Sequence, residues 1–308
     1  IRPCIGCCLG CIHAVFQLES GGCVVNPDVG REYLQPGGIE PAVHPKKCLV
    51  AGAGPGGLAA ARMLALRGHA VTVCDPQAQP GGALRLASKP PGRSELMDIL
   101  NYFMEELGGL NVEVRLNSAL NAALLREVAP EEVILATGSL VDTPMIKGLY
   151  RTDMQVCTVT ELLEGTLDVG LRVLVWGGNQ AGLVLADDLA AKGKSVTVLH
   201  RKEHFAEEMS SNDRYYLRER LKRGGVKLYK NVHVDAFLAD GVRFRVGDQA
   251  MELRGVESVV LADPFVSLRE AANLLKGCPA GVHFIGDAKQ PRHLMYAISE
   301  GEELGRSL

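Results

Sequence analysis

The chain reads Leu49-Val50-Ala51-Gly52-Ala53-Gly54-Pro55-Gly56-Gly57 where a short apolar run enters a glycine-rich turn. An Ala- and Leu-rich segment follows from Pro55 to about Arg67, and a second apolar run, Ala70–Cys74, ends at Asp75. This order predicts a strand, a tight turn, a helix and a second strand. Such a unit is typical of a domain that binds a dinucleotide at the edge of a parallel sheet.

Three positions of this first loop each require glycine for a different physical reason. Gly52 permits the tight turn, Gly54 lets a pyrophosphate approach the backbone, and Gly57 lets the helix pack close to the strand. The N-terminus of the helix offers backbone N–H groups and the positive end of its dipole. Asp75 lies 18 residues after the last glycine and can accept hydrogen bonds from ribose hydroxyls. We therefore expect a nucleotide on this loop.

A weaker copy of the pattern lies later in the chain. Strands expected at Arg172–Trp176 and Ser195–Leu199 flank a helix expected at Ala181–Lys192, and the turn reads Gly177-Gly178-Asn179-Gln180-Ala181-Gly182. Asn179 replaces the middle glycine and adds a side chain near the path of a phosphate. This second loop fits a dinucleotide site, and it also fits a vestigial or mononucleotide-filled one.

A basic turn, His200-Arg201-Lys202, follows the second strand of this copy, where Asp75 follows that of the first. A carboxylate at this place would bind a ribose 2′-hydroxyl and repel a 2′-phosphate. Arg201, with Lys202 as a further candidate, instead favours NADP(H) over NAD(H). A solvated basic turn without a ligand remains the alternative.

Cysteines crowd the start of the chain. Their spacing is Cys4-x2-Cys7-x3-Cys11-x11-Cys23, with Cys8 as a fifth thiol. Thiolates bind zinc or iron–sulfur clusters, and a cluster would give a flavin a one-electron outlet that zinc does not. The sequence favours iron–sulfur over zinc and over disulfides. By spacing Cys8 is the spare thiol, although an exchange of roles between Cys7 and Cys8 stays open.

Composition excludes several functions. The chain has 308 residues, 47% of them apolar, and a net charge of −3, so no broad electrostatic case exists for nucleic acid or an anionic membrane. A cytoplasmic location is expected, because large dinucleotide-binding proteins are normally cytosolic. Closely spaced cysteines in that compartment usually bind metal rather than form disulfides. The eight histidines are dispersed, and no general acid or base for substrate chemistry stands out, so the catalytic residues are left unassigned. Four scattered cysteines are expected to be inert core residues: Cys48, Cys74, Cys157 and Cys278.

The alternation of strands and helices predicts an α/β fold with two Rossmann-like dinucleotide-binding domains, the second inserted into the first. We expect a Cys-rich segment over 1–43, a first domain over 44–143 and 265–308, and an inserted domain over 144–264. Further helices are expected at Glu95–Leu107, Asp213–Arg223 and the C-terminus, where Leu294, Ile298, Gly301 and Leu304 share a face. Further strands are expected at Val112–Leu116, Glu132–Ala136 and Val282–Ile285, and residues 226–262 are expected to form short strands with turns, for example at Phe237–Val246.

These residues resemble the C-terminal half of the 2,4-dienoyl-CoA reductase and trimethylamine dehydrogenase family, iron–sulfur flavoproteins related to old yellow enzyme. The resemblance begins at Arg2-Pro3-Cys4-Ile5-Gly6-Cys7 and covers essentially the whole chain. The motifs that carry it further are Cys11, Cys23-x-x-Asn26-Pro27, Gly52–Gly57, Gly81-Gly82, Ala136-Thr137-Gly138 and Gly286-Asp287-Ala288.

The resemblance implies three cofactor sites. Cys4, Cys7, Cys11 and Cys23 would hold a [4Fe–4S] cluster. FAD, or ADP in the dehydrogenase branch, would contact Gly52, Gly54, Pro55, Gly56, Gly57, Asp75, Gly82, Ala136, Thr137, Gly138, Gly286 and Asp287. In the reductase branch NADP(H) or NAD(H) would contact Gly177, Asn179, Gln180, Gly182, His200, Arg201 and Lys202.

The resemblance also implies a partner. In the reductase branch electrons pass from NAD(P)H to FAD, to the cluster and then to an FMN in an N-terminal TIM barrel, which this chain lacks. The barrel would be fused in the same polypeptide or be a separate subunit, within an oligomer. One rival reading is an electron conduit of a dehydrogenase with a structural nucleotide. Another is a non-enzymatic scaffold that holds zinc and a nucleotide.

Overall fold

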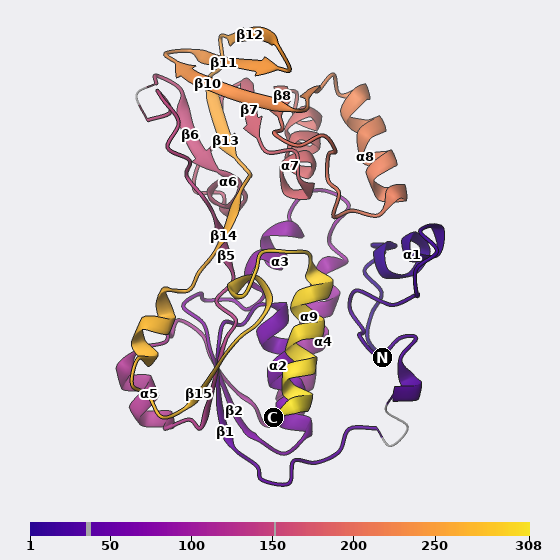
Figure 1. Ribbon diagram of the computed structural model, residues 1–308, viewed down its shortest axis with the longest axis vertical. Coiled ribbons are helices and arrows are strands. Elements are labelled where there is room, and N and C mark those ends of the chain that lie inside the picture. The colour runs from indigo at the N-terminus through magenta and orange to yellow at the C-terminus, as the bar shows by residue number, and fades with distance from the viewer. Residues whose placement is uncertain (35–37, 151) are drawn as a thin grey trace. The chain divides into compact units, whose positions relative to one another are not determined.

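The structure, a computed structural model, describes residues 1–34, 38–150 and 152–308 (Figure 1). The chain divides into two compact units. Unit 1 contains Ile1–Ser88, Gly92–Leu140 and Val266–Leu308, and unit 2 contains Lys89–Pro91 and Val141–Phe265. Unit 2 thus interrupts unit 1 in the sequence. The chain passes between the units at β5 (Ser139–Val141) and β14 (Phe265–Ser267), which pair as a two-stranded sheet.

Unit 1 is built on a five-stranded sheet whose strands are all parallel. In sheet order they are β15 (Gly281–Phe284), β4 (Glu132–Leu135), β1 (Lys47–Ala51), β2 (Ala70–Cys74) and β3 (Glu113–Arg115). The central strand β1 places Val50 beside Val73 on one side and Ile134 on the other. Strands buried on both faces read as continuous apolar runs, which is why β1, β2 and β4 can be located in the sequence.

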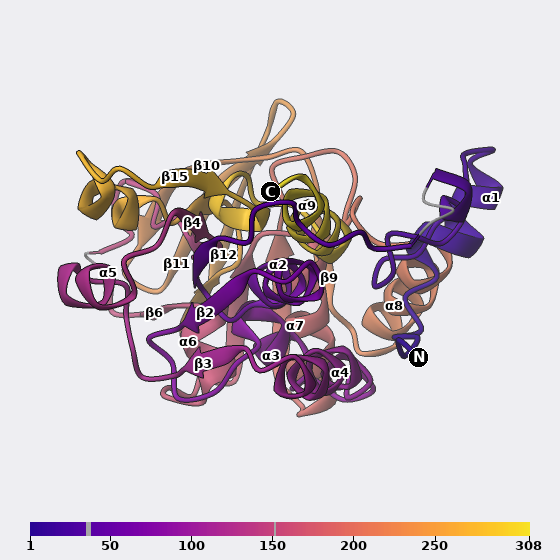
Figure 2. The ribbon, with the colours of Figure 1, turned by 90° about the horizontal axis from the view of Figure 1, so that it is seen from below.

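Helices cover both faces of this sheet (Figures 1 and 2). One face carries α2 (Pro55–Leu66), α4 (Leu96–Gly109) and α9 (Leu294–Ser307), and the other carries α5 (Ala122–Val128). Val50 and Ile134 pack toward the first group, while Leu49 and Leu135 pack toward Leu124 of α5. Unit 1 also contains short elements: η1 (Leu9–His13), α1 (Ala14–Phe16), η2 (Glu32–Leu34), α3 (Gly82–Ala87), η3 (Glu270–Leu275) and η4 (Gly286–Ala288).

Unit 2 repeats this architecture with a second five-stranded parallel sheet. In sheet order its strands are β6 (Gln155–Thr158), β13 (Ser258–Leu261), β7 (Arg172–Trp176), β8 (Ser195–Leu199) and β9 (Lys227–Tyr229). Its helices are α6 (Val159–Glu164), α7 (Gln180–Ala191) and α8 (Ser211–Arg223). An antiparallel sheet adds β10 (Val232–Leu238), β11 (Gly241–Val246) and β12 (Gln249–Arg254), and its Phe244 joins the buried core of the unit.

The mixed α/β fold with parallel sheets is confirmed. Short strands with turns were expected over 226–262, and the structure has β10 ending at Leu238 and β11 beginning at Gly241. Asp240 lies in the turn between them, and its carboxylate accepts from the N–H of Gly255 at 3.2 Å. Among the described residues no helix is long and apolar enough to span a bilayer.

Candidate functional site

The first glycine-rich loop connects β1 to α2 in unit 1, and its geometry requires two of its glycines. Gly52 has a φ of +117°, and a Cβ there would lie 2.2 Å from the carbonyl oxygen of Ala136. A Cβ at Gly57 would lie 2.0 Å from the carbonyl oxygen of Gly52. Both contacts are with backbone and cannot relax by rotating a side chain, so the loop can pack against β4 only with glycine at these places.

The middle of this loop is open. A Cβ at Gly54 would meet no atom within 4 Å, so no neighbour within the chain explains the missing side chain. Pro55 occupies the first position of α2 and has no N–H to donate. The N–H groups of Gly56 and Gly57 have no acceptor within the described parts of the chain. The helix therefore presents two donors and its positive dipole end to the space beside Gly54, as an anion site requires.

Asp75, directly after β2, is buried against the loop. One carboxylate oxygen accepts from the N–H of Ala53 at 2.7 Å, and the other accepts from the N–H of Gln77 at 2.8 Å. The carboxylate thus holds the loop in shape. Each oxygen keeps a lone pair for a further donor such as a ribose hydroxyl, so the expected role of Asp75 stays a prediction.

Helix α3 closes the loop from a third direction. The N–H of Gly81 donates to the carbonyl of Ala53 at 2.8 Å, and a Cβ at Gly82 would lie 3.4 Å from Cα of Gly54. Arg85, in the same helix, has a buried Nε without a hydrogen-bond partner in the described structure. Sequence reasoning missed Arg85, because a single arginine in a short helix carries no pattern. A half-buried arginine whose Nε has no partner in the described structure, beside a phosphate-type loop, is a candidate ligand contact.

Two of the segments expected to contact FAD lie next to each other: Ala136–Gly138 after β4 and Gly286-Asp287 after β15. Asp287 accepts from the hydroxyl of Ser139 at 2.9 Å and from the N–H of Arg292 at 3.1 Å. Burial raises the pKa of Asp287 above its ordinary value, although these hydrogen bonds oppose the rise. The hydroxyl of Thr137 donates to the carbonyl of Leu268, and Gly138 has open space around it. The structure therefore gathers Ala136–Gly138 and Asp287 beside the first loop.

Glycines let helix α9 pack closely against the start of α2. A Cβ at Gly301 would lie 2.3 Å from the carbonyl oxygen of Gly56, and a Cβ at Gly56 would lie 2.9 Å from the carbonyl oxygen of Ala297. The N–H of Gly286 donates to Glu300 of α9 at 2.8 Å. These contacts fix Gly286-Asp287 with respect to the first loop.

The N-terminal cysteines lie near one another. Burial raises the pKa of Cys7 to about 11, and the neighbouring thiols of Cys23, Cys11 and Cys4 contribute to this rise. Within the described residues, however, no group of three or more Cys, His, Asp or Glu side chains is placed to hold a metal ion. The four expected ligands are thus gathered but not arranged as a closed site.

Backbone contacts bring the two halves of the cysteine segment together. The N–H of Gly22 donates to the carbonyl of Gly10 at 2.6 Å, which places Cys11 and Cys23 next to a paired stretch of backbone.

Three of the four scattered cysteines are buried as expected, and burial raises the pKa of their thiols. The values are about 12 for Cys48, about 11 for Cys74 and about 11 for Cys157.

A buried ion pair, which sequence reasoning missed, anchors the cysteine segment to α9. The guanidinium of Arg2 donates to Glu302, whose side chain is 1% exposed, and to the carbonyl of Val25 at 3.0 Å. Asp28 pairs with Arg306 at 2.7 Å. The pairs link residues about 300 positions apart, so no local pattern announces them; the only signal is Glu302 on the apolar side of α9.

The second loop, between β7 and α7 in unit 2, is a close copy of the first. The N–H of Gly178 donates to Nδ1 of His200 at 3.0 Å, as that of Ala53 donates to Asp75. The N–H of Ala206 donates to the carbonyl of Gly178 at 2.8 Å, as that of Gly81 donates to the carbonyl of Ala53. Every residue of the second set lies 125 positions after its counterpart. His200 therefore takes the structural place of Asp75.

Asn179 stabilises this loop with its side chain. Its Oδ1 accepts from the N–H of Gly182 at 2.9 Å, and its Nδ2 donates to the carbonyl of Ala262 at 2.6 Å. A Cβ at Gly182 would lie 2.0 Å from the carbonyl oxygen of Gly177, as at the corresponding glycine of the first loop. Asn179 is thus an N-cap that replaces a glycine without breaking the turn.

His200 is a structural residue of this loop. It is 3% exposed, and its Nε2 lies 3.0 Å from the carbonyl oxygen of His204. Since Nδ1 accepts from Gly178, the proton must sit on Nε2. Burial holds the pKa of His200 below its ordinary value, so the ring is neutral near pH 7. The ring of Phe205 stacks on it with centroids 5.2 Å apart.

Arg201 and Lys202 are both exposed beyond the end of β8. Nε of Arg201 lies 3.0 Å from a carboxylate oxygen of Asp263, which follows β13. Half of the Arg201 side chain remains accessible, so its outer guanidinium nitrogens can still reach a ligand. The expected preference for a 2′-phosphate is not tested by this arrangement.

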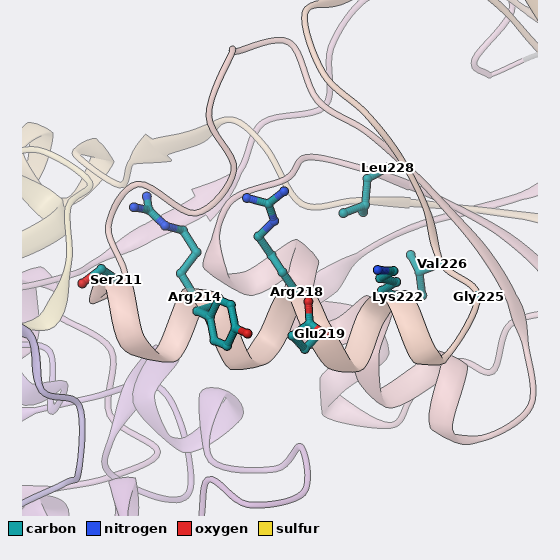
Figure 3. A pocket seen from close by; sticks show the side chains of 9 residues that line it. Ser211, Arg214, Arg218, Glu219, Lys222, Gly225, Val226 and Leu228 are labelled. Carbon is teal, nitrogen blue, oxygen red and sulfur yellow. The ribbon is translucent and has the colours of Figure 1, made fainter.

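A separate depression of about 760 Å³ runs along α8 in unit 2 (Figure 3). Its cations Arg214, Arg218 and Lys222 recur every four residues and therefore share one face of the helix. The remaining lining residues are Ser211, Tyr215, Glu219, Gly225, Val226 and Leu228. None of the expected site residues lines it, and we assign it no ligand.

Known proteins match this arrangement. Residues 46–264 match the family described as pyridine nucleotide-disulphide oxidoreductase. The metal reductase of Desulforamulus reducens is 30% identical over 97% of this chain and 49% of its own length. The NADH oxidase of Thermoanaerobacter brockii is 32% identical over 98% of this chain and 47% of its own length.

A solved structure matches as well. The 2-naphthoyl-CoA reductase, solved in complex with 2-naphthoyl-CoA, superposes with a TM-score of 0.92 and 30% identity. That superposition covers 99% of this chain and 46% of the other. The chain thus spans about half the length of the relatives that it matches.

Proposed function

The chain belongs to the pyridine nucleotide-disulphide oxidoreductase family, and from this premise we propose that it is the electron-input module of a larger flavoprotein reductase. Unit 1 would hold FAD, unit 2 would hold NAD(P)H, and the N-terminal cysteines would hold a [4Fe–4S] cluster. The observation that carries the proposal is the duplicated loop, in which the same backbone contacts recur 125 residues apart beside two helix N-termini.

Several features of unit 1 support FAD. Gly54 leaves an unfilled space in front of the two open N–H groups of α2, which suits a pyrophosphate. Asp75 would hold a ribose hydroxyl while it fixes the loop, and the gathered Thr137-Gly138 and Asp287 would contact the polar chain of the flavin. Bound flavin supplies hydride acceptance and one-electron release.

The residues of unit 2 would orient the nicotinamide nucleotide rather than supply an acid. Hydride transfer between nicotinamide and flavin needs stacking and positioning, and no proton must be moved by a side chain. Neutral His200 would keep the second loop in shape. Arg201 and Lys202 would meet a 2′-phosphate, which favours NADP(H), and a bound phosphate would compete with Asp263 for Arg201.

Thiol chemistry and proximity support the cluster. Cys4, Cys11 and Cys23 lie near enough to Cys7 to raise the pKa of its thiol, and four thiolates are the usual ligands of a [4Fe–4S] cluster. Arg2 and Glu302 would keep this segment against α9 while the ligands close around the metal. Cys8 would remain outside the ligand set.

A barrel partner is supported by length and by surface. The relatives are about twice as long as this chain, and an FMN-containing barrel, which the resemblance implies, would fit in the other half. The N-terminal segment also exposes large apolar side chains, as surfaces that contact a partner do. They are Ile12, Val15, Phe16, Leu18, Tyr33 and Leu34. We propose that the barrel, fused or separate, receives the electrons and determines the substrate.

An anaerobic titration of the purified chain tests the proposal. The chain, carrying its FAD and cluster, is mixed first with NADPH and then with NADH, and flavin absorbance is followed. We expect bleaching by nucleotide, with NADPH effective at lower concentration. Bleaching by dithionite but by neither nucleotide would contradict the donor site.

The second candidate is an electron conduit with a structural nucleotide, as in the dehydrogenase branch. Asn179 favours it, because its side chain uses the Gly182 N–H that a phosphate would otherwise approach. In that case a reduced barrel flavin would feed the cluster, and an external carrier would receive the electrons. The dithionite-only outcome of the titration is the result that this candidate predicts.

A further inference from the structure

The N-terminus of α7 is covered by side chains of unit 2 itself. The N–H of Gln180, first in the helix, donates to the carboxylate of Glu208. The N–H of Gly182 donates to Asn179 at 2.9 Å. Of the first three N–H groups of α7, only that of Ala181 lacks an acceptor among the residues that the structure describes. A helix terminus that suits a phosphate is therefore largely satisfied already.

The first loop differs at the corresponding places. Pro55 stands in the position of Gln180 and has no N–H, while the N–H groups of Gly56 and Gly57 are open in the described structure. The counterpart of Glu208, 125 positions earlier, is Ala83, which carries no charge. The two copies thus share a backbone, but only the second brings a carboxylate to the helix.

Glu208 is held in place by a packed segment. The N–H of Ala206 donates to the carbonyl of Gly178 at 2.8 Å, and the N–H of Met209 donates to the carbonyl of Ala206 at 3.0 Å. Ala206 and Met209 are buried, and Phe205 stacks on His200 of the loop. Glu208 directly precedes buried Met209 and follows buried Ala206 by two positions, so the packing of this segment restricts where its side chain can lie.

We propose that Glu208 is an internal competitor of the nucleotide pyrophosphate and sets how tightly the second loop binds NADP(H) or NAD(H). The inference rests on the proposed nucleotide site of unit 2. A carboxylate and a phosphate use the same donors, and two anions close together repel each other. The nucleotide must therefore displace Glu208 from Gln180 when it binds.

The test is the affinity for NADP⁺, which does not reduce the flavin. The complete purified chain with its cofactors is titrated by calorimetry as wild type, Glu208→Gln and Glu207→Gln. Glu207 is the exposed neighbour with the same charge, so it controls for net charge. We expect Glu208→Gln to lower the Kd about tenfold, because the repulsion is removed. Glu207→Gln should stay within about twofold of wild type, since an exposed charge is screened by salt.

The outcomes separate this inference from the proposed function. If wild type binds NADP⁺ and Glu208→Gln binds equally or more weakly, Glu208 is a structural cap, and the inference is overturned while the donor site stands. If none of the three proteins binds NADP⁺ or NAD⁺, the donor site of unit 2 is wrong and the inference falls with it. Binding by Glu208→Gln alone supports the inference in its strongest form. Equal melting temperatures of the three proteins would confirm that each variant is folded.

Discussion

At the scale of single residues, Gly54 separates the needs of folding from those of binding. Its φ of −77° suits any residue, and a Cβ there meets nothing within 4 Å. We therefore expect Gly54→Ala to fold with a melting temperature within about 2 °C of wild type. The methyl group would fill the proposed pyrophosphate space, so FAD affinity should fall at least about tenfold. Thermal unfolding of the apoprotein and titration with FAD measure the two effects.

Gly57→Ala is the matched comparison for Gly54→Ala. Its Cβ would lie 2.0 Å from a backbone oxygen, so this variant should lose folding stability by about 2 kcal/mol or more even without a ligand. Unchanged FAD affinity in Gly54→Ala would show that no phosphate lies beside that residue. The motif gives the two glycines different roles in the sequence, and the structure adds that a Cβ meets no atom at Gly54 but a backbone oxygen at Gly57.

His200 makes the stability of unit 2 depend on pH. Because burial holds its folded-state pKa below the ordinary value of 6.5, the unfolded chain takes up the proton first as the pH falls. The stabilisation is complete above about pH 6.5 and is lost below it, by about 1.4 kcal/mol for each pH unit until the folded-state pKa is reached. Urea unfolding at pH 7.5, 6.5 and 5.5 measures this slope.

His200→Asn is the control for that slope, because its amide oxygen can accept from Gly178 without titrating. His69 and His293 also have lowered pKa values, but both remain in the variant and cancel in the comparison. Equal pH slopes for the two proteins would contradict the role given to His200. The sequence showed His200 at the place of Asp75 but not that its ring replaces the carboxylate as an acceptor.

At the scale of elements, a buried ion pair between Arg2 and Glu302 anchors the cysteine segment to α9. Burial raises the pKa of Glu302, and Arg2 opposes that rise. Arg2→Met would remove the hydrogen-bonded cation and leave the buried carboxylate only the longer 3.6 Å contact with Arg306, which costs about 3 kcal/mol. We expect the segment before β1 to detach, and chymotrypsin to cut it, at least about tenfold faster than in wild type. Timed digestion followed by mass spectrometry measures the rate.

Arg31→Met is the matched control for Arg2→Met. Arg31 lies 3.9 Å from Glu303, and both side chains are more than half exposed. An exposed pair contributes about 0–1 kcal/mol, so digestion should hardly change. Equal acceleration in both variants would mean that loss of an arginine, rather than of the buried pair, loosens the segment.

Elements with a strong local pattern could be predicted from the sequence, and the others could not. Strands β2, β7 and β8 lie where the apolar runs predict them, and α2 begins at Pro55 as expected. Short helices such as α3 and α5 were not foreseen, because six or seven residues are too few to show a helical period. Contacts between distant segments, such as Arg2 with Glu302, leave no local trace at all.

At the scale of the whole molecule, one fold occurs twice and the two copies have diverged at their loops. The sequence revealed the repeat through its glycines, but the 125-residue correspondence of contacts needed coordinates. The two copies differ in how far the N–H groups at the start of the helix are already hydrogen-bonded. In unit 1 the N–H groups of Gly56 and Gly57 are open in the described structure, whereas in unit 2 Asn179 accepts from Gly182, the counterpart of Gly57. Glu208 accepts from Gln180, whose counterpart Pro55 has no N–H. A permanently bound nucleotide fits the open copy, and an exchangeable one fits the copy that must be uncovered.

The cysteine segment should be separable in function from both nucleotide sites. Cys11 is one of the four expected ligands and acts on the pKa of Cys7, whereas Cys8 is the spare thiol by spacing. We expect Cys11→Ser to lose most of the iron, about four atoms per chain when the cluster is complete, while Cys8→Ser retains it. Reduction of the bound flavin by NADPH should be unchanged in both variants, because it needs only the two nucleotide sites. Transfer of electrons from the flavin to a one-electron acceptor should fall at least about tenfold in Cys11→Ser alone, since the flavin loses its one-electron outlet.

Iron analysis measures the cluster content of the Cys variants, and stopped-flow absorbance measures flavin reduction and onward electron transfer. Full iron in Cys11→Ser, or equal iron loss in Cys8→Ser, would contradict the ligand set, and slowed flavin reduction in Cys11→Ser would contradict the separation of the sites.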